Sequence, residues 1–141
     1  MKILFVCLGN ICRSPAAQAV VRDLRPDLTT DSAGTGSWHI GKAPYGPMQA
    51  AMQNRGWDMS DLRARQTVAA DFDAFDLIIC MDDDNVDAIE RLRPAGNGTP
   101  VLLFSQYADE TGAVPDPYFT RDFDGALDMI DRCARGLAAA V

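Results

Sequence analysis

Short segments with the residue pattern of buried strands alternate along this chain with longer segments in which apolar residues recur at helical spacing. The strand segments are residues 3–6, 28–32, 75–81 and 101–104. The helical segments are residues 15–25, 48–55, 68–72, 82–93 and 122–140. Ser14 is expected to cap the first helix, with Pro15 at its first helical position. Regular alternation of strand and helix predicts right-handed crossovers and an α/β fold with three layers, helices covering both faces of a parallel sheet.

Size and composition narrow the class of protein. The 141 residues suit one domain over 1–141, and 48% apolar with 23% charged residues is ordinary globular composition. The apolar run near the N-terminus is too short and wrongly flanked for a signal peptide or a membrane span. Four cysteines in such a chain predict reduced thiols in the cytoplasm. A net charge of −7 argues against nucleic acid as a partner.

The loop between the first strand and the first helix carries a cysteine and an arginine separated by five residues, Cys7 and Arg13. Backbone N–H groups of such a loop can converge on an anion, and the helix adds the positive end of its dipole. These groups favour a thiolate at Cys7, while the guanidinium fork of Arg13 can hold two phosphoryl oxygens. The pattern predicts a cysteine nucleophile in a phosphate-binding loop, whose other members are Leu8, Gly9, Asn10, Ile11, Cys12 and Ser14.

A candidate proton donor follows the fourth strand. Asp116 lies between Pro115 and Pro117, which stiffen it, and the carboxyl ends of parallel strands meet at one edge of a sheet. A carboxylic acid opposite the thiolate can protonate a leaving oxygen and later activate water. On spacing alone, however, an aspartate between two prolines is more typical of a turn.

No metal or other cofactor is expected. Zinc binding by Cys7 and Cys12 would need further ligands, and the chain has one histidine, His39, which we interpret as a rim or loop residue. The acidic run 82–84 could attract Mg²⁺, but acidic residues are favoured at a helix start in any case.

Five segments together resemble the low molecular weight protein tyrosine phosphatases: Cys-Leu-Gly-Asn-Ile-Cys-Arg-Ser at 7–14, and the stretches 31–35, 63–66, 77–82 and 114–118. The resemblance covers nearly the whole chain. It implies a four-stranded parallel sheet of order 2-1-3-4 and hydrolysis of phosphotyrosine through a phosphocysteine. It also implies that Cys7 is the nucleophile, that Arg13 binds the phosphate and the transition state, and that Asp116 is the general acid and base.

Further roles rest on the same resemblance. Trp38 and Tyr118 would wall the cleft on either side of the substrate ring. Cys12 would form a reversible disulfide with Cys7 on oxidation. The hydroxyl of Ser14 can donate to the Cys7 thiolate.

The scaffold of the loop is implied in the same way. Asn10 would hold the loop through Ser32 and loop backbone. Many relatives add a histidine to this network, and Leu62 stands at that position here.

Three alternatives remain open. Protein-arginine phosphatases typically carry threonine at the position of Ile11, whose apolar side chain favours an aryl substrate. Arsenate reductases of this fold need two relay cysteines, and although Cys80 could serve as one, Asp87 stands where the other would be. A non-catalytic module would retain the anion site and lose Cys7, Arg13 or Asp116. The expected partners are a phosphotyrosine-containing protein and a cognate tyrosine kinase.

Overall fold

A four-stranded parallel sheet forms the centre of the molecule, which a computed structural model describes over residues 1–141. Its strands are β1 (Lys2–Cys7), β2 (Thr29–Gly34), β3 (Leu77–Cys80) and β4 (Val101–Leu103), in the order 2-1-3-4. All three pairings are parallel. In this order β1 is a central strand, between β2 and β3. The order implied by the family resemblance is therefore confirmed.

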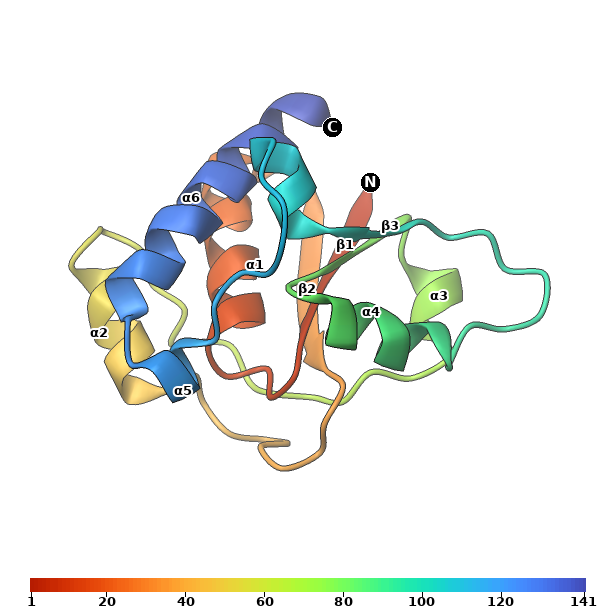
Figure 1. Ribbon diagram of the computed structural model, residues 1–141, viewed down its shortest axis with the longest axis horizontal. Helices are drawn as coiled ribbons and strands as arrows, with labels where there is room; N and C mark the ends of the chain where they lie inside the picture. The colour runs from red at the N-terminus through yellow and green to blue at the C-terminus, as the bar shows by residue number, and fades with distance from the viewer.

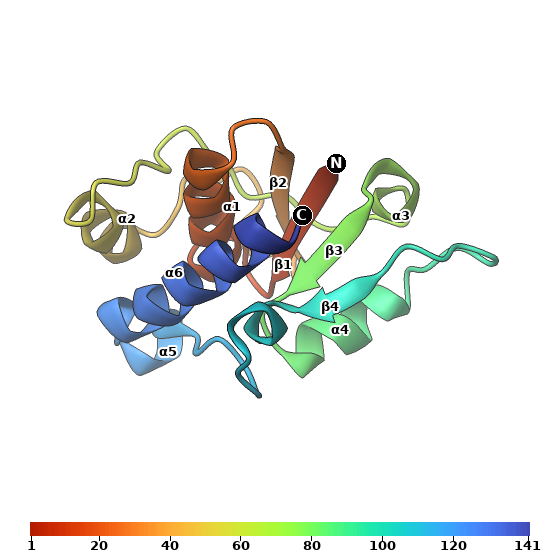
Figure 2. The same ribbon diagram turned by 90° about the horizontal axis from the view of Figure 1, so that it is seen from above.

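Helices cover both faces of this sheet, as seen from above in Figure 2. One face carries α1 (Arg13–Leu24), α2 (Gly46–Gln53) and α6 (Phe123–Ala140), with α5 (Pro117–Thr120) beside them. The opposite face carries α3 (Asp71–Ala74) and α4 (Asp83–Glu90), and the 3₁₀ helix η1 (Phe104–Ala108) follows β4 and packs on α6. None of the helices is both long and apolar enough to cross a membrane.

The alternation of side chains along β1 creates two separate cores. Ile3 and Phe5 face α1 and α6 in a cluster of 27 buried residues, whereas Leu4 and Val6 face α3 and α4 in a smaller cluster of seven. Because every residue from Ile3 to Cys7 is buried, both faces of the strand read as apolar in the sequence.

The predicted elements are present, with different ends. The first helix begins at Arg13, earlier than expected, and its cap position is Cys12 with no side-chain cap, so the prediction that Ser14 caps it is wrong. The third helix is only four residues long and begins at Asp71. Two short elements, η1 and α5, were not predicted, because four or five residues are too few to show a periodic pattern.

Both chain ends lie at one edge of the molecule and the loop after β1 lies at the other, as Figure 1 shows. At this second edge the loop from β1 to α1 meets the loop after β2 and the segment that leads into α5. The topology therefore gathers residues from distant parts of the sequence around the end of the central strand.

Candidate active site

The loop between β1 and α1 turns its polar groups toward the sulfur of Cys7. Asn10 has a left-handed backbone (φ 57°), and its N–H donates to Cys7 Sγ at 3.2 Å. The Ser14 hydroxyl lies 2.9 Å from the same sulfur. Because Ser14 Oγ already accepts a hydrogen bond from Asn10 Nδ2, its own proton is available to Cys7. Ser14 thus contacts Cys7, the expected nucleophile, from inside the helix instead of capping it.

A buried network of side chains fixes this loop. Asn10 Nδ2 also donates to Ser32 Oγ at 2.9 Å, and its Oδ1 accepts from the Arg65 backbone N–H at 3.0 Å. Ser32 in turn donates to Gln18 Oε1 at 2.7 Å. Leu62 takes no part in this network and packs against the larger core. Gln18 was missed by the sequence analysis, because a polar residue inside a helix carries no local signal of a distant partner.

Arg13 lies at the back of the site, almost fully buried. Its Nη1 donates to Asp82 Oδ2 at 2.8 Å and to the Val114 carbonyl at 3.1 Å, and its Nη2 donates to Asp116 Oδ2 at 3.3 Å. Burial alone would lower the pKa of Arg13, but the charge of Cys7 and the hydrogen bond to Asp82 outweigh it and raise that pKa. The guanidinium therefore remains charged in the free protein.

Asp82 has a second role that the sequence analysis missed. It caps α4 as expected for an acidic helix start, and its Oδ1 accepts from the Asn85 backbone N–H at 2.8 Å in a capping box. Its other oxygen, however, holds Arg13. Nothing local to residues 82–84 reveals a partner 69 residues away.

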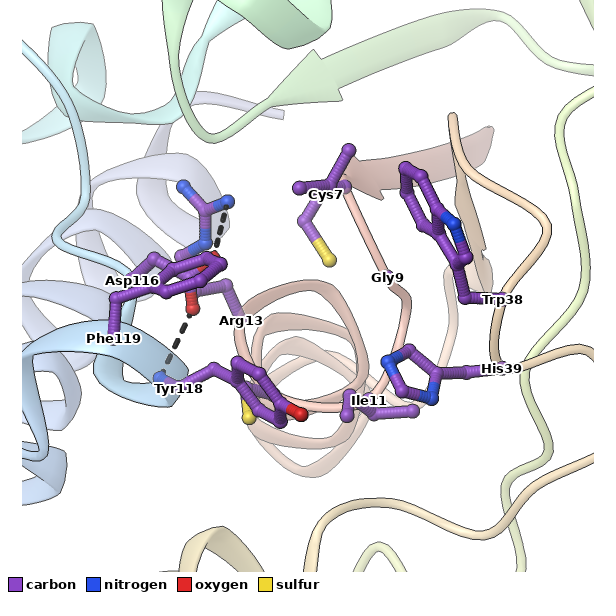
Figure 3. A pocket seen from close by; sticks show the side chains of 11 residues that line it. Cys7, Gly9, Ile11, Arg13, Trp38, His39, Asp116, Tyr118 and Phe119 are labelled. Carbon is purple, nitrogen blue, oxygen red and sulfur yellow. Dashed lines mark hydrogen bonds and ion pairs between the residues drawn. The ribbon is translucent and has the colours of Figure 1, made fainter.

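Asp116 reaches the site from the opposite side. It is the N-cap residue of α5, where its Oδ1 accepts from the Tyr118 backbone N–H at 3.1 Å while Oδ2 faces Arg13. In Figure 3 its carboxylate lies beside the guanidinium of Arg13, across the cavity from Cys7. Cys7, Arg13 and Asp116, which are far apart in the sequence, thus surround one space.

The space is a cavity of about 390 Å³ with apolar walls. Cys7, Ile11 and Arg13 lie in its interior, and Trp38, His39 and Tyr118 stand around its mouth, as Figure 3 shows. Trp38 is 68% exposed, so its indole is free to contact a ligand. The wall also includes Phe119, 71% exposed, which the sequence analysis did not single out.

The second loop cysteine is chemically distinct from the first. Burial, followed by the nearby charges of Cys7 and Asp116, raises the pKa of Cys12 to about 12, so Cys12 stays a neutral thiol. Burial also raises the pKa of Cys80, on β3. All four cysteines are free, and nowhere do three His, Cys, Asp or Glu side chains converge as a metal ion would require.

Known proteins are similar in sequence to this chain over most of their length. The family described as low molecular weight phosphotyrosine protein phosphatase matches residues 2–141. The low molecular weight protein-tyrosine-phosphatase YfkJ of Bacillus subtilis is 36% identical, over 100% of this chain and 96% of the relative. PtpA of Staphylococcus aureus, of the same description, is 37% identical over 91% of this chain and 85% of its own.

Solved structures agree with the sequence comparison. The crystal structure of YfkJ superposes with a TM-score of 0.93 and covers 99% of this chain and 93% of that one. A protein tyrosine phosphatase from Entamoeba histolytica, with Hepes in its active site, gives 0.89 at 35% identity, over 97% and 94%. A Drosophila arginine phosphatase gives 0.93 at 29% identity, over 99% and 97%. The chain therefore belongs to the low molecular weight phosphotyrosine protein phosphatase family, whose activity is that of a protein-tyrosine phosphatase.

Proposed function

We propose that this protein hydrolyses phosphotyrosine monoesters through a phosphocysteine at Cys7. The observation that carries the proposal is the arrangement of the cavity, in which the Cys7 sulfur accepts the Asn10 N–H and faces both Arg13 and the Asp116 carboxyl. A nucleophile, a cation for the phosphoryl oxygens and a proton carrier are the three groups that the reaction requires.

In the first step the Cys7 thiolate attacks phosphorus, so that an S–P bond forms as the bond to the phenolic oxygen breaks. Asp116, protonated when substrate is bound, gives its proton to that oxygen, and tyrosine leaves as a neutral phenol. Arg13 exchanges its contact with Asp116 for two phosphoryl oxygens and retains Asp82 as its partner. The contact of Nη1 with Asp82 thus orients the guanidinium while its remaining N–H groups bind substrate.

In the second step water attacks phosphorus and the S–P bond breaks. Asp116, now a carboxylate, takes the proton from this water, and Cys7 leaves as a thiolate. The Ser14 hydroxyl, 2.9 Å from the sulfur, stabilises the departing charge by donating its proton in a hydrogen bond. Inorganic phosphate is the second product, and the enzyme returns to its starting protonation.

The walls of the cavity support an aryl substrate. Ile11 is apolar and lines the cavity, and Trp38 and Tyr118 offer flat faces on opposite sides of it. The fold itself does not distinguish tyrosine from arginine phosphatases, since both kinds of structure superpose equally well. An arsenate reductase relay is disfavoured because Cys80 is fully buried and position 87 is aspartate.

The remaining expectations concern the cellular setting. Four free thiols suit a reducing cytoplasm, where we place the protein. Its partners there would be phosphotyrosine-containing proteins and the tyrosine kinase that modifies them. On oxidation, Cys12 would form a disulfide with Cys7 and protect the nucleophile from further oxidation.

The test is hydrolysis of p-nitrophenyl phosphate in the presence of a chelator, with phosphotyrosine peptide, phosphoarginine and arsenate as competing substrates. Cys7→Ser should abolish turnover, whereas the neighbouring thiol variant Cys12→Ser should retain most of it. Asp116→Ala should depress turnover of the phosphotyrosine peptide, whose leaving group needs a proton, about 100-fold or more. Activity that survives Cys7→Ser would refute the mechanism, and preferential turnover of phosphoarginine would refute the substrate class.

A further inference from the structure

A cationic side chain joins the end of α5 to the start of α2. Arg121, the residue that ends α5, has a left-handed backbone (φ 64°), and its N–H bonds the Pro117 carbonyl at 2.9 Å. Its Nη1 donates to Tyr45 Oη at 2.9 Å. The guanidinium carbon lies 5.4 Å from the centroid of the Tyr45 ring and 5.2 Å from that of Phe123, so the cation contacts two aromatic faces.

Tyr45 connects this cation to the phosphate-binding loop. Its backbone N–H donates to the Ile11 carbonyl at 2.9 Å, and it is the N-cap residue of α2. Its ring centroid lies 5.2 Å from that of Tyr118, in the middle of α5. Tyr45 therefore touches the loop that holds the nucleophile and the helix that begins at Asp116, although neither Tyr45 nor Arg121 lines the cavity.

The helix α5 has few other attachments. It is a single turn, with Tyr118 39% and Phe119 71% exposed. At its start Pro117 is buried, and the Asp116 side chain contacts the rest of the protein through the ion pair with Arg13. In the proposed reaction this ion pair is lost when the phosphoryl group binds Arg13. The direction of the Asp116 carboxyl then depends on how the helix itself is held, by the buried Pro117 at its start and by Arg121 at its end.

We propose that the contact between Arg121 and Tyr45 is a brace that positions the Asp116 carboxyl over the leaving oxygen. The proposal rests on the function proposed above, and both members of the brace are positioning residues. Arg121 is exposed to solvent, but it is near enough to the site for its charge to lower the pKa of Cys12. Burial has the larger, opposite effect on that pKa. Loss of the brace should therefore impair protonation of the leaving group more than phosphate binding.

Leaving groups of different basicity separate these two effects. p-Nitrophenolate leaves without much help, whereas the phenolate of phenyl phosphate or phosphotyrosine, whose conjugate acid has a pKa near ~10, needs a proton. Arg121→Gly removes the side chain and leaves a residue suited to φ 64°. Its kcat/KM should stay within about twofold of the unsubstituted protein for p-nitrophenyl phosphate and fall about tenfold for phenyl phosphate.

Graded variants sharpen the test. Tyr45→Phe deletes only the hydroxyl that accepts from Arg121 and should give a smaller change in the same direction. Arg121→Lys keeps the charge and should recover part of the loss for phenyl phosphate. The matched control is Arg55→Gln, because Arg55 also links α2 to the α6 region, through Asp124 and Asp128, but does not reach α5. Arg55→Gln should leave kcat/KM unchanged for both substrates.

Each result decides between the proposals. If Arg121→Gly and Tyr45→Phe leave the ratio of the two kcat/KM values unchanged, or lower both values equally, the brace is refuted. If Asp116→Ala also leaves that ratio unchanged, the proposed general acid is wrong, which is a separate failure. Thermal melting of each variant identifies loss of folding, and if Arg121→Gly fails to fold, Tyr45→Phe alone decides.

Discussion

Replacement of Asn10 by alanine should be among the most damaging single changes at the loop. The Asn10 side chain is 2% exposed and makes three hydrogen bonds, to Ser14 Oγ at 2.8 Å, to Ser32 Oγ at 2.9 Å and from the Arg65 N–H at 3.0 Å. Alanine deletes all three. The alanine would also have to adopt the left-handed backbone conformation of this position (φ 57°), which asparagine tolerates better than other residues with a Cβ.

The magnitude follows from these contacts. Each lost hydrogen bond costs about 1 kcal/mol of stability, so the three together cost about 3 kcal/mol. The left-handed conformation adds about 1 kcal/mol for alanine, which gives a loss near ~4 kcal/mol for Asn10→Ala. Asn10→Gly loses the same three bonds but has no Cβ to strain the backbone, so its loss should stop at about 3 kcal/mol.

Urea denaturation of the two variants and the unsubstituted protein measures both quantities. A change in midpoint at constant slope reports a difference in the free energy of unfolding. A loss below about 1 kcal/mol for Asn10→Ala would refute the importance of the network. A glycine variant no more stable than the alanine variant would refute the contribution assigned to the left-handed backbone.

Three other predictions concern the surroundings of the loop. Asp82→Asn can still cap α4 but weakens the charge-assisted bond to Arg13, so kcat/KM for p-nitrophenyl phosphate should fall about tenfold with little change in urea stability. The pKa of Cys12 is about 12 in the folded state, against 9.0 when unfolded, so only the unfolded chain loses this proton between these two pH values. The free energy of unfolding should therefore decline as pH rises from 9.0 to about 12, and less steeply in Cys12→Ala. Gly34→Ala would place a Cβ 2.7 Å from the backbone of the phosphate loop and should lower the free energy of unfolding by about 2 kcal/mol. Gly46→Ala, where no atom lies within 4 Å of the added Cβ, should change it little, and equal unfolding midpoints for the two variants would contradict this prediction.

The sequence was most informative where local pattern and chemistry coincide. The central strand is recognisable because both its faces are buried, so residues 3–6 are continuously apolar. The loop of Cys7 and Arg13 is recognisable because its spacing serves one chemical task. Asp116 could be placed at the same edge because parallel strands all end there. For the strand and the loop a short stretch of chain contains the signal, whereas the role of Asp116 was implied by the family resemblance.

Features that depend on partners distant in the sequence were not predictable in this way. Asp82 reads as a helix cap, which it is, and its contact with Arg13 appears only once β3 lies beside β1. Ser14 was expected to cap a helix that starts at Pro15, but the helix begins two residues earlier, at Arg13, so that only the other expected role of Ser14, its contact with Cys7, is present. Leu62 stands where many relatives have a histidine in the Asn10 network. The network still has its hydrogen bonds without that histidine, since Asn10 donates to Ser32 and Ser32 donates to Gln18.

The position of β1 in the middle of the sheet has a consequence for how activity arises during synthesis. Cys7, the proposed nucleophile, leaves the ribosome well before residues 77–80, with which its strand pairs, and before residue 116, its proposed acid partner. Such nonlocal parallel pairing is slow to form. A chain that has not yet reached residue 116 thus exposes a thiol that lacks its proposed acid partner and its buried surroundings, and the site is assembled only once that residue is available.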